Sequence, residues 1–177
     1  LGADFENAAI RNCRRFAYEE VMPIIRQPDG PAARAEDPQV VKLLQQMFEL
    51  AMLLRRRRTE QGALQMGIPE IEIDFDRDGN VTGAHERHHD ESHEIIEEFM
   101  LLANETVARH LETHAVPTLY RIHEEPDVLK VAKFEEFISG FGYSLGTQLT
   151  ALRPRHFQKL LERIHDKPEE RPIAFLM

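Results

Sequence analysis

The sequence is poor in several features that would place it in a familiar class. It contains one cysteine, Cys13, so no internal disulfide and no cysteine-based zinc site can form. No apolar run reaches the roughly 18 residues of a transmembrane helix, and the amino-terminal residues resemble no signal peptide. We therefore expect a chain without a membrane span, located in the reducing cytoplasm.

No residue is assigned as a catalytic nucleophile. Cys13 has no assigned base, so a structural cysteine is the favoured interpretation. Glu97 and Glu98 are adjacent, and adjacent helical residues point about 100° apart. They cannot act on one substrate as an acid/base pair, and at least one is expected to be a surface or structural carboxylate.

Positive charge is in the minority. Lys and Arg number 22 against 31 Asp and Glu, giving a formal net charge of -9, which repels a polyanion at long range. The arginines are nevertheless clustered, at Arg11, Arg14 and Arg15 and at Arg55 to Arg58. The second cluster fits either a phosphate clamp or a solvated helix end favoured by the helix dipole, and we prefer the helix end.

Helical periodicity dominates what is present. With 42% hydrophobic residues, the chain is long enough for one globular domain with a core. Capping residues such as Asp37, Asp90 and Asp127, and terminators such as Gly140, mark helix boundaries. The expected helices are Tyr18 to Ile25, Pro38 to about Arg58, Asp90 to near His114, Asp127 to Ile138 and Arg155 to Ile164.

One segment changes period. Ile71, Ile73 and Phe75 alternate with acidic residues, as in a half-buried strand. Asp78-Gly79-Asn80 provides a tight turn, and Val81 to His85 would return antiparallel. The predicted fold class is therefore α+β, mostly helical with one antiparallel hairpin.

Two segments resemble metal sites, and each has a simpler interpretation. Asp74 to Gly79 resembles the start of a calcium loop, but His85 stands where the twelfth-position glutamate is needed, so a hairpin turn is preferred. His89 and His93 have helical i,i+4 spacing within a group that includes His85 and His88. Because no third ligand is well placed, surface histidines are preferred, and no metal ligand is predicted in this chain.

The carboxyl end differs from an ordinary solvated terminus. Residues 172–177 form the apolar run Pro-Ile-Ala-Phe-Leu-Met, which stops without a polar tail. Free termini are normally solvated, so the run looks cut within a structural element.

Four ordered blocks resemble one family, that of ribonuclease II and ribonuclease R. Arg14 to Val21 resembles its Ala-Arg-Leu-Thr-Tyr-x-x-Val block, and His88 to Leu111 its helix with Ile-Glu-Glu-x-Met-x-x-Ala-Asn. Leu119 to Pro126 resembles the Tyr-Arg-x-His-x-x-Pro turn. Arg58 to Leu64 with Pro69-Glu70 resembles a further block, except that Gln61 replaces an arginine.

The resemblance implies a hydrolytic 3′-to-5′ exoribonuclease that degrades single-stranded RNA to nucleoside 5′-monophosphates. Its two-metal chemistry uses magnesium held by clustered aspartates. That acidic motif is not found here, so residues 1–177 are expected to be the central part of one catalytic domain, truncated at both ends and inactive alone. The alternatives are a catalytically dead RNA-binding or protein-interaction module and, less favoured, a helical scaffold unrelated to RNA.

The resemblance also implies three RNA-binding residues and no catalytic residue in this chain. Tyr18 matches the aromatic residue on which the family stacks a base near the 3′ end. Arg121 and His123 lie in the extended turn and are candidates for phosphate binding. The alternative for Tyr18 is a buried aromatic at a helix start, and for the other two it is bracing of the turn.

Overall fold

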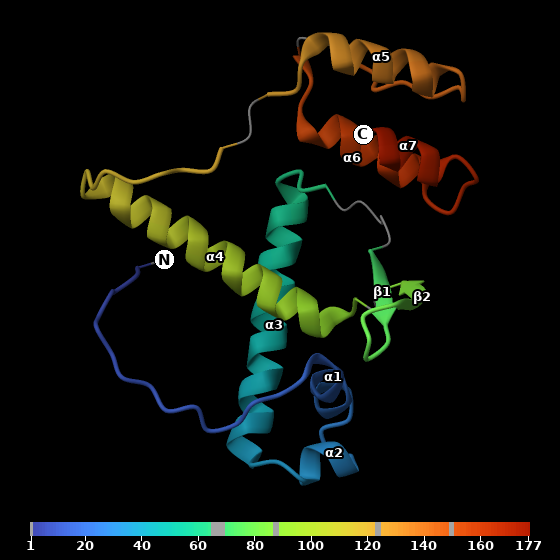
Figure 1. Cartoon of the computed structure of the whole chain (residues 1–177). Coiled ribbons are helices and arrows are strands. Elements are labelled where there is room, and N and C mark those ends of the chain that lie inside the picture. The colour runs from blue at the N-terminus through green and yellow to red at the C-terminus, as the bar shows by residue number, and fades with distance from the viewer. Residues whose placement is uncertain (1, 65–69, 87–88, 123–124, 149–150) are drawn as a thin grey trace. The chain divides into compact units, whose positions relative to one another are not determined.

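The computed structural model describes residues 2–64, 70–86, 89–122, 125–148 and 151–177 (Figure 1). These residues form seven helices and one two-stranded antiparallel sheet. They belong to two compact units, Leu1–Arg55 with His89–Arg121, and Arg56–His88 with Ile122–Met177. The expected α+β class, mostly helical with one hairpin, is confirmed. None of the described helices is both long and apolar enough to cross a membrane.

The first unit contains α1 (Tyr18–Arg26), α2 (Pro31–Arg34), most of α3 (Pro38–Glu60) and α4 (Glu91–Thr113). The expected helices from Tyr18, Pro38 and Asp90 are therefore confirmed. Helix α2 was not expected, because its proline-rich start indicated a turn. Pro31 is the first residue of this four-residue helix, where a missing backbone N–H costs nothing.

The core of the first unit lies between α1, α2 and α3. Ile24, Ala33, Val41 and Leu44 are buried there, with the partly buried Phe16 packed against them. Helix α1 also contacts the start of α4, where the Arg26 guanidinium lies 2.6 Å from a carboxylate oxygen of Glu91. Packing and one ion pair thus hold the short α1 in place.

The second unit contains α5 (Val128–Ser139), α6 (Pro154–Ile164) and α7 (Glu170–Leu176). The Asp127 carboxylate caps α5 by accepting hydrogen bonds from the backbone nitrogens of Leu129 and Lys130. Helix α7 was not expected. Pro172 falls in its first turn, where backbone N–H groups have no partner within the helix, so the proline does not break it.

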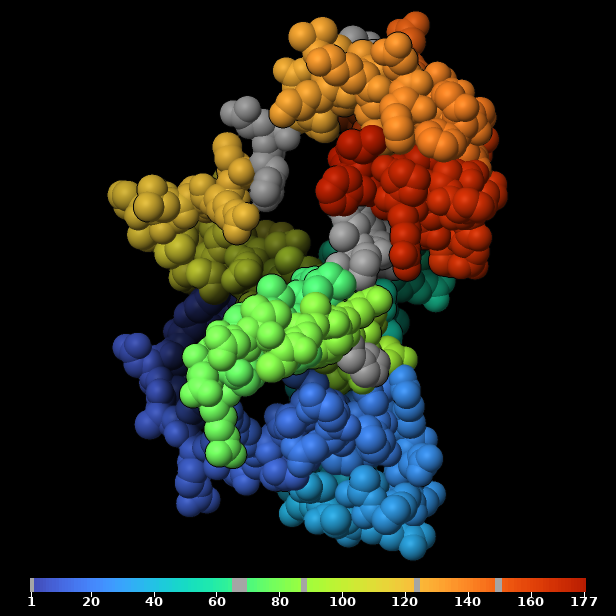
Figure 2. All heavy atoms as spheres, turned by 45° about the vertical axis from the view of Figure 1, so that its right-hand side comes forward, coloured from blue at the N-terminus to red at the C-terminus, as the bar shows by residue number. Residues whose placement is uncertain are grey.

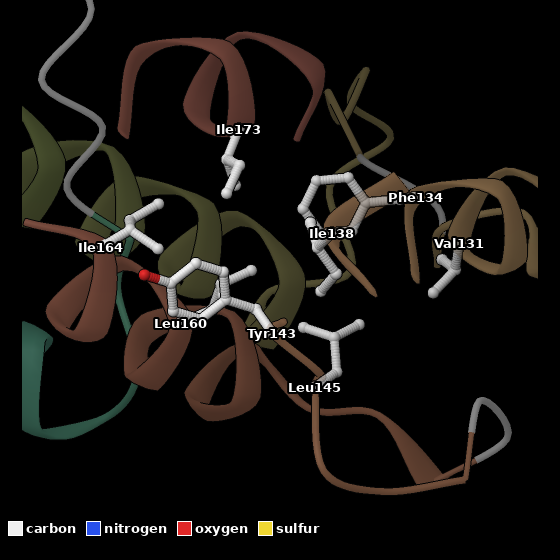
Figure 3. Packing of buried hydrophobic residues seen from close by; sticks show 8 residues of the cluster. All are labelled: Val131, Phe134, Ile138, Tyr143, Leu145, Leu160, Ile164 and Ile173. Atoms are coloured by element: carbon white, nitrogen blue, oxygen red, sulfur yellow. The ribbon is translucent and has the colours of Figure 1, made fainter. Parts of the chain in front are cut away.

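The core of the second unit gathers side chains from these three helices and from the loop after α5 (Figure 3). Ile138, Ile164 and Ile173 are 0% exposed, so each helix contributes a completely buried residue. Figure 3 shows Tyr143 and Leu145, from the loop, between residues of α5 and α6. The apolar end of the chain therefore belongs to this core through Ile173.

The predicted hairpin is present as β1 (Ile71–Phe75) and β2 (Val81–Glu86). The turn is held by the Asp76 carboxylate, which accepts hydrogen bonds from the backbone nitrogens of Asp78 and Asn80. The half-buried strand was a wrong expectation, since all five residues of β1 are exposed. Figure 2 shows the hairpin, in light green, open to view. A two-stranded ribbon has too few strands to bury its own apolar face.

Candidate nucleic-acid interface

Tyr18, the candidate base-stacking residue, is the first residue of α1. The helix begins here because Glu20 reaches back, so that its carboxylate accepts a hydrogen bond of 2.6 Å from the Ala17 backbone nitrogen. The Tyr18 residue is 40% exposed, so it is not the buried aromatic of the alternative interpretation. One face of its ring stacks on His93, with ring centroids 3.9 Å apart and planes tilted by 16°.

His93 lies in the first turn of α4, and the cap of that helix holds it. Its Nδ1 atom is 3.2 Å from Oδ1 of Asp90, which also accepts hydrogen bonds from the backbone and hydroxyl of the buried Ser92. Burial raises the pKa of Asp90, but the hydrogen bonds from Ser92 and His93 outweigh it and hold that pKa below its ordinary value. The cap is thus a charged carboxylate at a helix amino terminus.

His89 and His93, which were expected to be surface histidines and not a metal-binding pair, stack on one another. Their ring centroids are 5.0 Å apart and the planes are tilted by 28°. Tyr18, His93 and His89 therefore form a column of three rings in the first unit. The sequence did not reveal this column, because Tyr18 and His93 are distant along the chain and no spacing rule connects them. His88, the neighbour of His89, lies outside the described residues.

Three of the clustered arginines are paired with acids. The Arg14 guanidinium is 2.8 Å from Glu36 and 3.1 Å from Glu20, and these hydrogen bonds, Glu36 first, raise the pKa of Arg14 above its ordinary value. In the second cluster, Arg55 pairs with Glu94, and Arg56 lies 3.0 Å from Glu60. The preferred interpretation of that cluster, a helix end, agrees with its place in the last turns of α3.

Arg121 follows α4 in a segment without helix or strand, and its side chain is exposed. Tyr120, the preceding residue, is 49% exposed. No hydrogen bond or cation–π contact joins Arg121 to Tyr18 in the part of the chain that the structure describes. His123 lies outside the described residues.

The other end of α4 carries a second group of rings. Phe5 of the extended amino-terminal segment lies 4.2 Å from the ring of His110, which is 4.2 Å from that of His114. These residues and Arg109 line a pocket of about 360 Å³. His110 follows His93 by about 25 Å along the helix axis, so the pocket is separate from the Tyr18 column.

The structure also describes Cys13 and the adjacent Glu97 and Glu98. Cys13 is exposed, so it is not the buried structural cysteine that was expected. Glu98 is 3% exposed whereas Glu97 is exposed, which confirms that the two carboxylates cannot face one substrate.

Potential metal ligands converge at one place among the described residues. Side-chain atoms of His165, Asp166 and Glu170 lie within 4.8 Å of one another, between α6 and α7. Asp166 and His165 are well exposed, and Glu170 already hydrogen-bonds the Asp166 backbone nitrogen. With one aspartate, this group does not fit the aspartate cluster that the family resemblance implies for magnesium. Asp76 of the former calcium candidate is occupied by the hairpin turn.

A protein-family model described as RNB domain matches residues 1–177. The chain belongs to the RNB domain family. Ribonuclease R of Aquifex aeolicus is 37% identical to it over 173 residues, 98% of this chain and 24% of that protein. Ribonuclease R of Escherichia coli is 27% identical over 176 residues, 99% of this chain and 21% of that protein.

The RNB assignment agrees with solved structures. Mycoplasma genitalium RNase R in complex with ribose-methylated single-stranded RNA has a TM-score of 0.83 at 24% identity, over 92% of this chain and 25% of that one. The complex of the same protein with double-stranded RNA has a TM-score of 0.74 at 25% identity, over 79% and 25%. The fold of this chain is thus that of part of RNase R. The chain spans about a quarter of the length of these relatives.

Proposed function

We propose that this RNB-family chain is part of a cytoplasmic exoribonuclease that hydrolyses single-stranded RNA from the 3′ end to nucleoside 5′-monophosphates. The observation that carries the proposal is the match of the RNB domain model to all 177 residues. Because the chain spans about a quarter of its relatives, the activity is proposed for the parent protein. Residues 1–177 are proposed as the central part of its catalytic domain.

Tyr18 is proposed to stack an RNA base near the 3′ end. Stacking on an aromatic ring tolerates every base and contributes roughly 1–3 kcal/mol per base, which suits an enzyme that must accept all four nucleotides. The 40% exposure of Tyr18 supports this role, since ring surface remains for a base. The complex of Mycoplasma genitalium RNase R with ribose-methylated single-stranded RNA supports single-stranded RNA as the ligand.

Arg121 is proposed to bind phosphate, and His123 is proposed as a second donor of the same turn. A guanidinium on an exposed extended segment presents a fork of N–H donors that matches phosphate oxygens. With a formal net charge of -9, the chain depends on such local cations to hold a polyanion.

Magnesium is proposed as the cofactor of the parent enzyme, where it would activate water and stabilise the leaving oxygen. The described residues contain no cluster that fits the implied aspartates, so the ligands are proposed to lie outside these 177 residues. The residues of this chain then bind and orient RNA, and the chain alone is expected to be inactive.

Fluorescence anisotropy of a labelled single-stranded oligoribonucleotide, titrated with the 177-residue chain at several salt concentrations, tests the binding part. The expected result is binding that weakens as salt rises, because counterions are released from neutralised phosphates. A flat baseline at every salt concentration would contradict the proposal and favour a scaffold unrelated to RNA.

Gel analysis of the same RNA with magnesium tests whether the metal ligands lie outside the 177-residue chain. The 177-residue chain is expected to leave the RNA intact, whereas the full-length parent protein releases mononucleotides. Mononucleotides from the 177-residue chain would place the metal site within it and contradict the proposal. Binding without cleavage by the full-length protein would favour the catalytically dead module.

A further inference from the structure

We propose that His93 is a positioning residue for Tyr18: its imidazole backs one face of the tyrosine ring, so that the opposite face is presented to an RNA base. The inference rests on the proposed function, because it assigns a support to the residue that would stack RNA. Nothing in the sequence pattern connects the two residues, which come from different helices, α1 and α4.

The rings of Tyr18 and His93 are stacked face to face. Centroids 3.9 Å apart and planes tilted by 16° describe two nearly parallel rings in contact. The His93 side chain is 20% exposed, whereas Tyr18 is 40% exposed. His93 therefore covers one face of Tyr18 from the protein side, and the remaining accessible surface of Tyr18 faces solvent.

His93 is itself held rigidly, which is what a support requires. Its Nδ1 atom lies 3.2 Å from Oδ1 of Asp90 and 3.4 Å from the Asp90 backbone nitrogen. Asp90 is in turn fixed by the backbone and hydroxyl of Ser92, a residue 2% exposed. The cap of α4 thus positions the imidazole through its Nδ1 atom.

The helix that carries Tyr18 is anchored at both ends to the same turn of α4. Tyr18, at its start, stacks on His93, and Arg26, at its end, pairs with Glu91 at 2.6 Å. His89 also stacks on His93, with centroids 5.0 Å apart. A base stacked on Tyr18 would add a fourth ring to a column that is already assembled.

The stacking of Tyr18 on His93 before RNA binds should raise the affinity for RNA. A tyrosine that is free to rotate must be immobilised when a base stacks on it, and that ordering weakens binding. A tyrosine already packed on His93 loses less freedom. Removing the His93 ring while keeping a similar apolar volume should therefore weaken RNA binding roughly 3- to 10-fold.

The test uses the 177-residue chain and a single-stranded oligoribonucleotide with 2-aminopurine near its 3′ end, whose fluorescence falls when it stacks on an aromatic ring. Tyr18→Ala should weaken binding and abolish the fluorescence decrease. His93→Leu should weaken binding and reduce the decrease, and His93→Phe, which retains a ring but loses the Nδ1 contacts with Asp90, should restore both in part. In the Tyr18→Ala background, His93→Leu should have no further effect, because the support has nothing to position.

An NMR measurement without RNA tests the packing of His93 on Tyr18 separately from RNA binding. The Tyr18 ring protons should show an upfield NMR shift from the His93 ring current, and this shift should disappear in His93→Leu. Retained dispersion of the remaining signals shows that the variant is folded. The NMR shift tests whether His93 packs on Tyr18, and the Tyr18→Ala result tests whether Tyr18 stacks an RNA base.

Three outcomes would overturn the inference. If Tyr18→Ala leaves RNA binding intact, the proposed stacking role fails, and the support for it fails as well. If Tyr18→Ala weakens binding but His93→Leu does not, only the inference about His93 fails. The inference also fails, with the proposed function unharmed, if His93→Leu weakens binding equally with Tyr18 and with Ala at that position, since the effect would then be independent of the tyrosine.

Discussion

The hydroxyl of Tyr143 donates a hydrogen bond of 2.6 Å to Oε1 of Glu169. The ammonium of Lys167 donates to the same hydroxyl oxygen at 3.0 Å, so this oxygen both donates and accepts. Tyr143 is 9% exposed and belongs to the core of the second unit. One side chain therefore connects the loop after α5, the apolar core and the start of α7.

Replacing Tyr143 by Phe should lower the free energy of unfolding by about 1 kcal/mol, because the ring stays packed while the hydrogen bonds to its hydroxyl are lost. Urea unfolding of the 177-residue chain measures this change. Tyr120→Phe is the matched control, since Tyr120 is 49% exposed and lies outside both buried clusters. Equal stability of Tyr143→Phe and the wild-type chain would contradict the prediction.

The same hydrogen bond should make stability depend on acid pH. The Tyr143 hydroxyl lowers the pKa of Glu169 below its ordinary value of 4.5. The charged carboxylate is favoured in the folded state, so its stabilisation is complete above pH 4.5 and is lost as pH falls through the lowered pKa. In Tyr143→Phe, NMR titration should find the pKa of Glu169 shifted upward. An unchanged pKa would assign its lowering to another group.

His165 should make the folded state less stable as pH rises, which is opposite to the effect of Glu169. Its hydrogen bond with Glu170, and then the charge of Asp166, raise the pKa of His165 above its ordinary value of 6.5. The protonated imidazole is favoured in the folded state, so its stabilisation is complete below pH 6.5 and is lost as pH rises through the raised pKa. Thermal unfolding should show His165→Gln losing this dependence while keeping its stability at higher pH. A wild-type dependence in the variant would exclude His165 as the cause.

Shortening a buried side chain in the core of the second unit should lower the free energy of unfolding. Ile138 is 0% exposed, so Ile138→Ala removes buried methyl groups and leaves a cavity, at a cost of about 2–5 kcal/mol. Leu119→Ala is the control, because Leu119 is completely exposed and should change stability by less than about 0.5 kcal/mol. Chemical denaturation compares the two, and a similar loss for both would show that Ile138 does not pack as described.

Arg121 should contribute to the salt dependence of RNA binding. For single strands the slope of log affinity against log salt is about -0.7 per neutralised phosphate, so Arg121→Gln should reduce its magnitude by about 0.7. Arg56→Gln serves as control, because Arg56 is paired with Glu60 and its removal should leave the slope unchanged. Anisotropy titrations at four salt concentrations measure both slopes. Equal slopes for Arg121→Gln and wild type would exclude a phosphate contact at this residue.

Local chemistry explains what the sequence allowed us to predict. Asp90 and Asp127 cap helices through contacts within three residues, and Asp76 closes a turn with Asn80, so nearby residues determine these boundaries. Helix α7 could not be inferred, because its stability depends on burying Ile173 in a core made with other helices, α5 and α6. The same holds for the column at Tyr18, whose partner on another helix follows from tertiary packing.

The exposure of the apolar side of the hairpin could not be predicted from the alternating sequence pattern. Alternation identified the strands, since Ile71, Ile73 and Phe75 must share one face. Alternation does not say whether any element covers that face. The burial of a strand depends on neighbours that its own sequence does not encode.

The exposed thiol of Cys13 makes this chain convenient for spectroscopy. It belongs to the only cysteine among 177 residues and lies five positions before Tyr18. One maleimide dye or nitroxide will therefore attach at a single defined place, with no background mutations. An extended chain of five residues spans at most about 18 Å, which is within the range of a fluorophore pair formed with a labelled 3′ nucleotide.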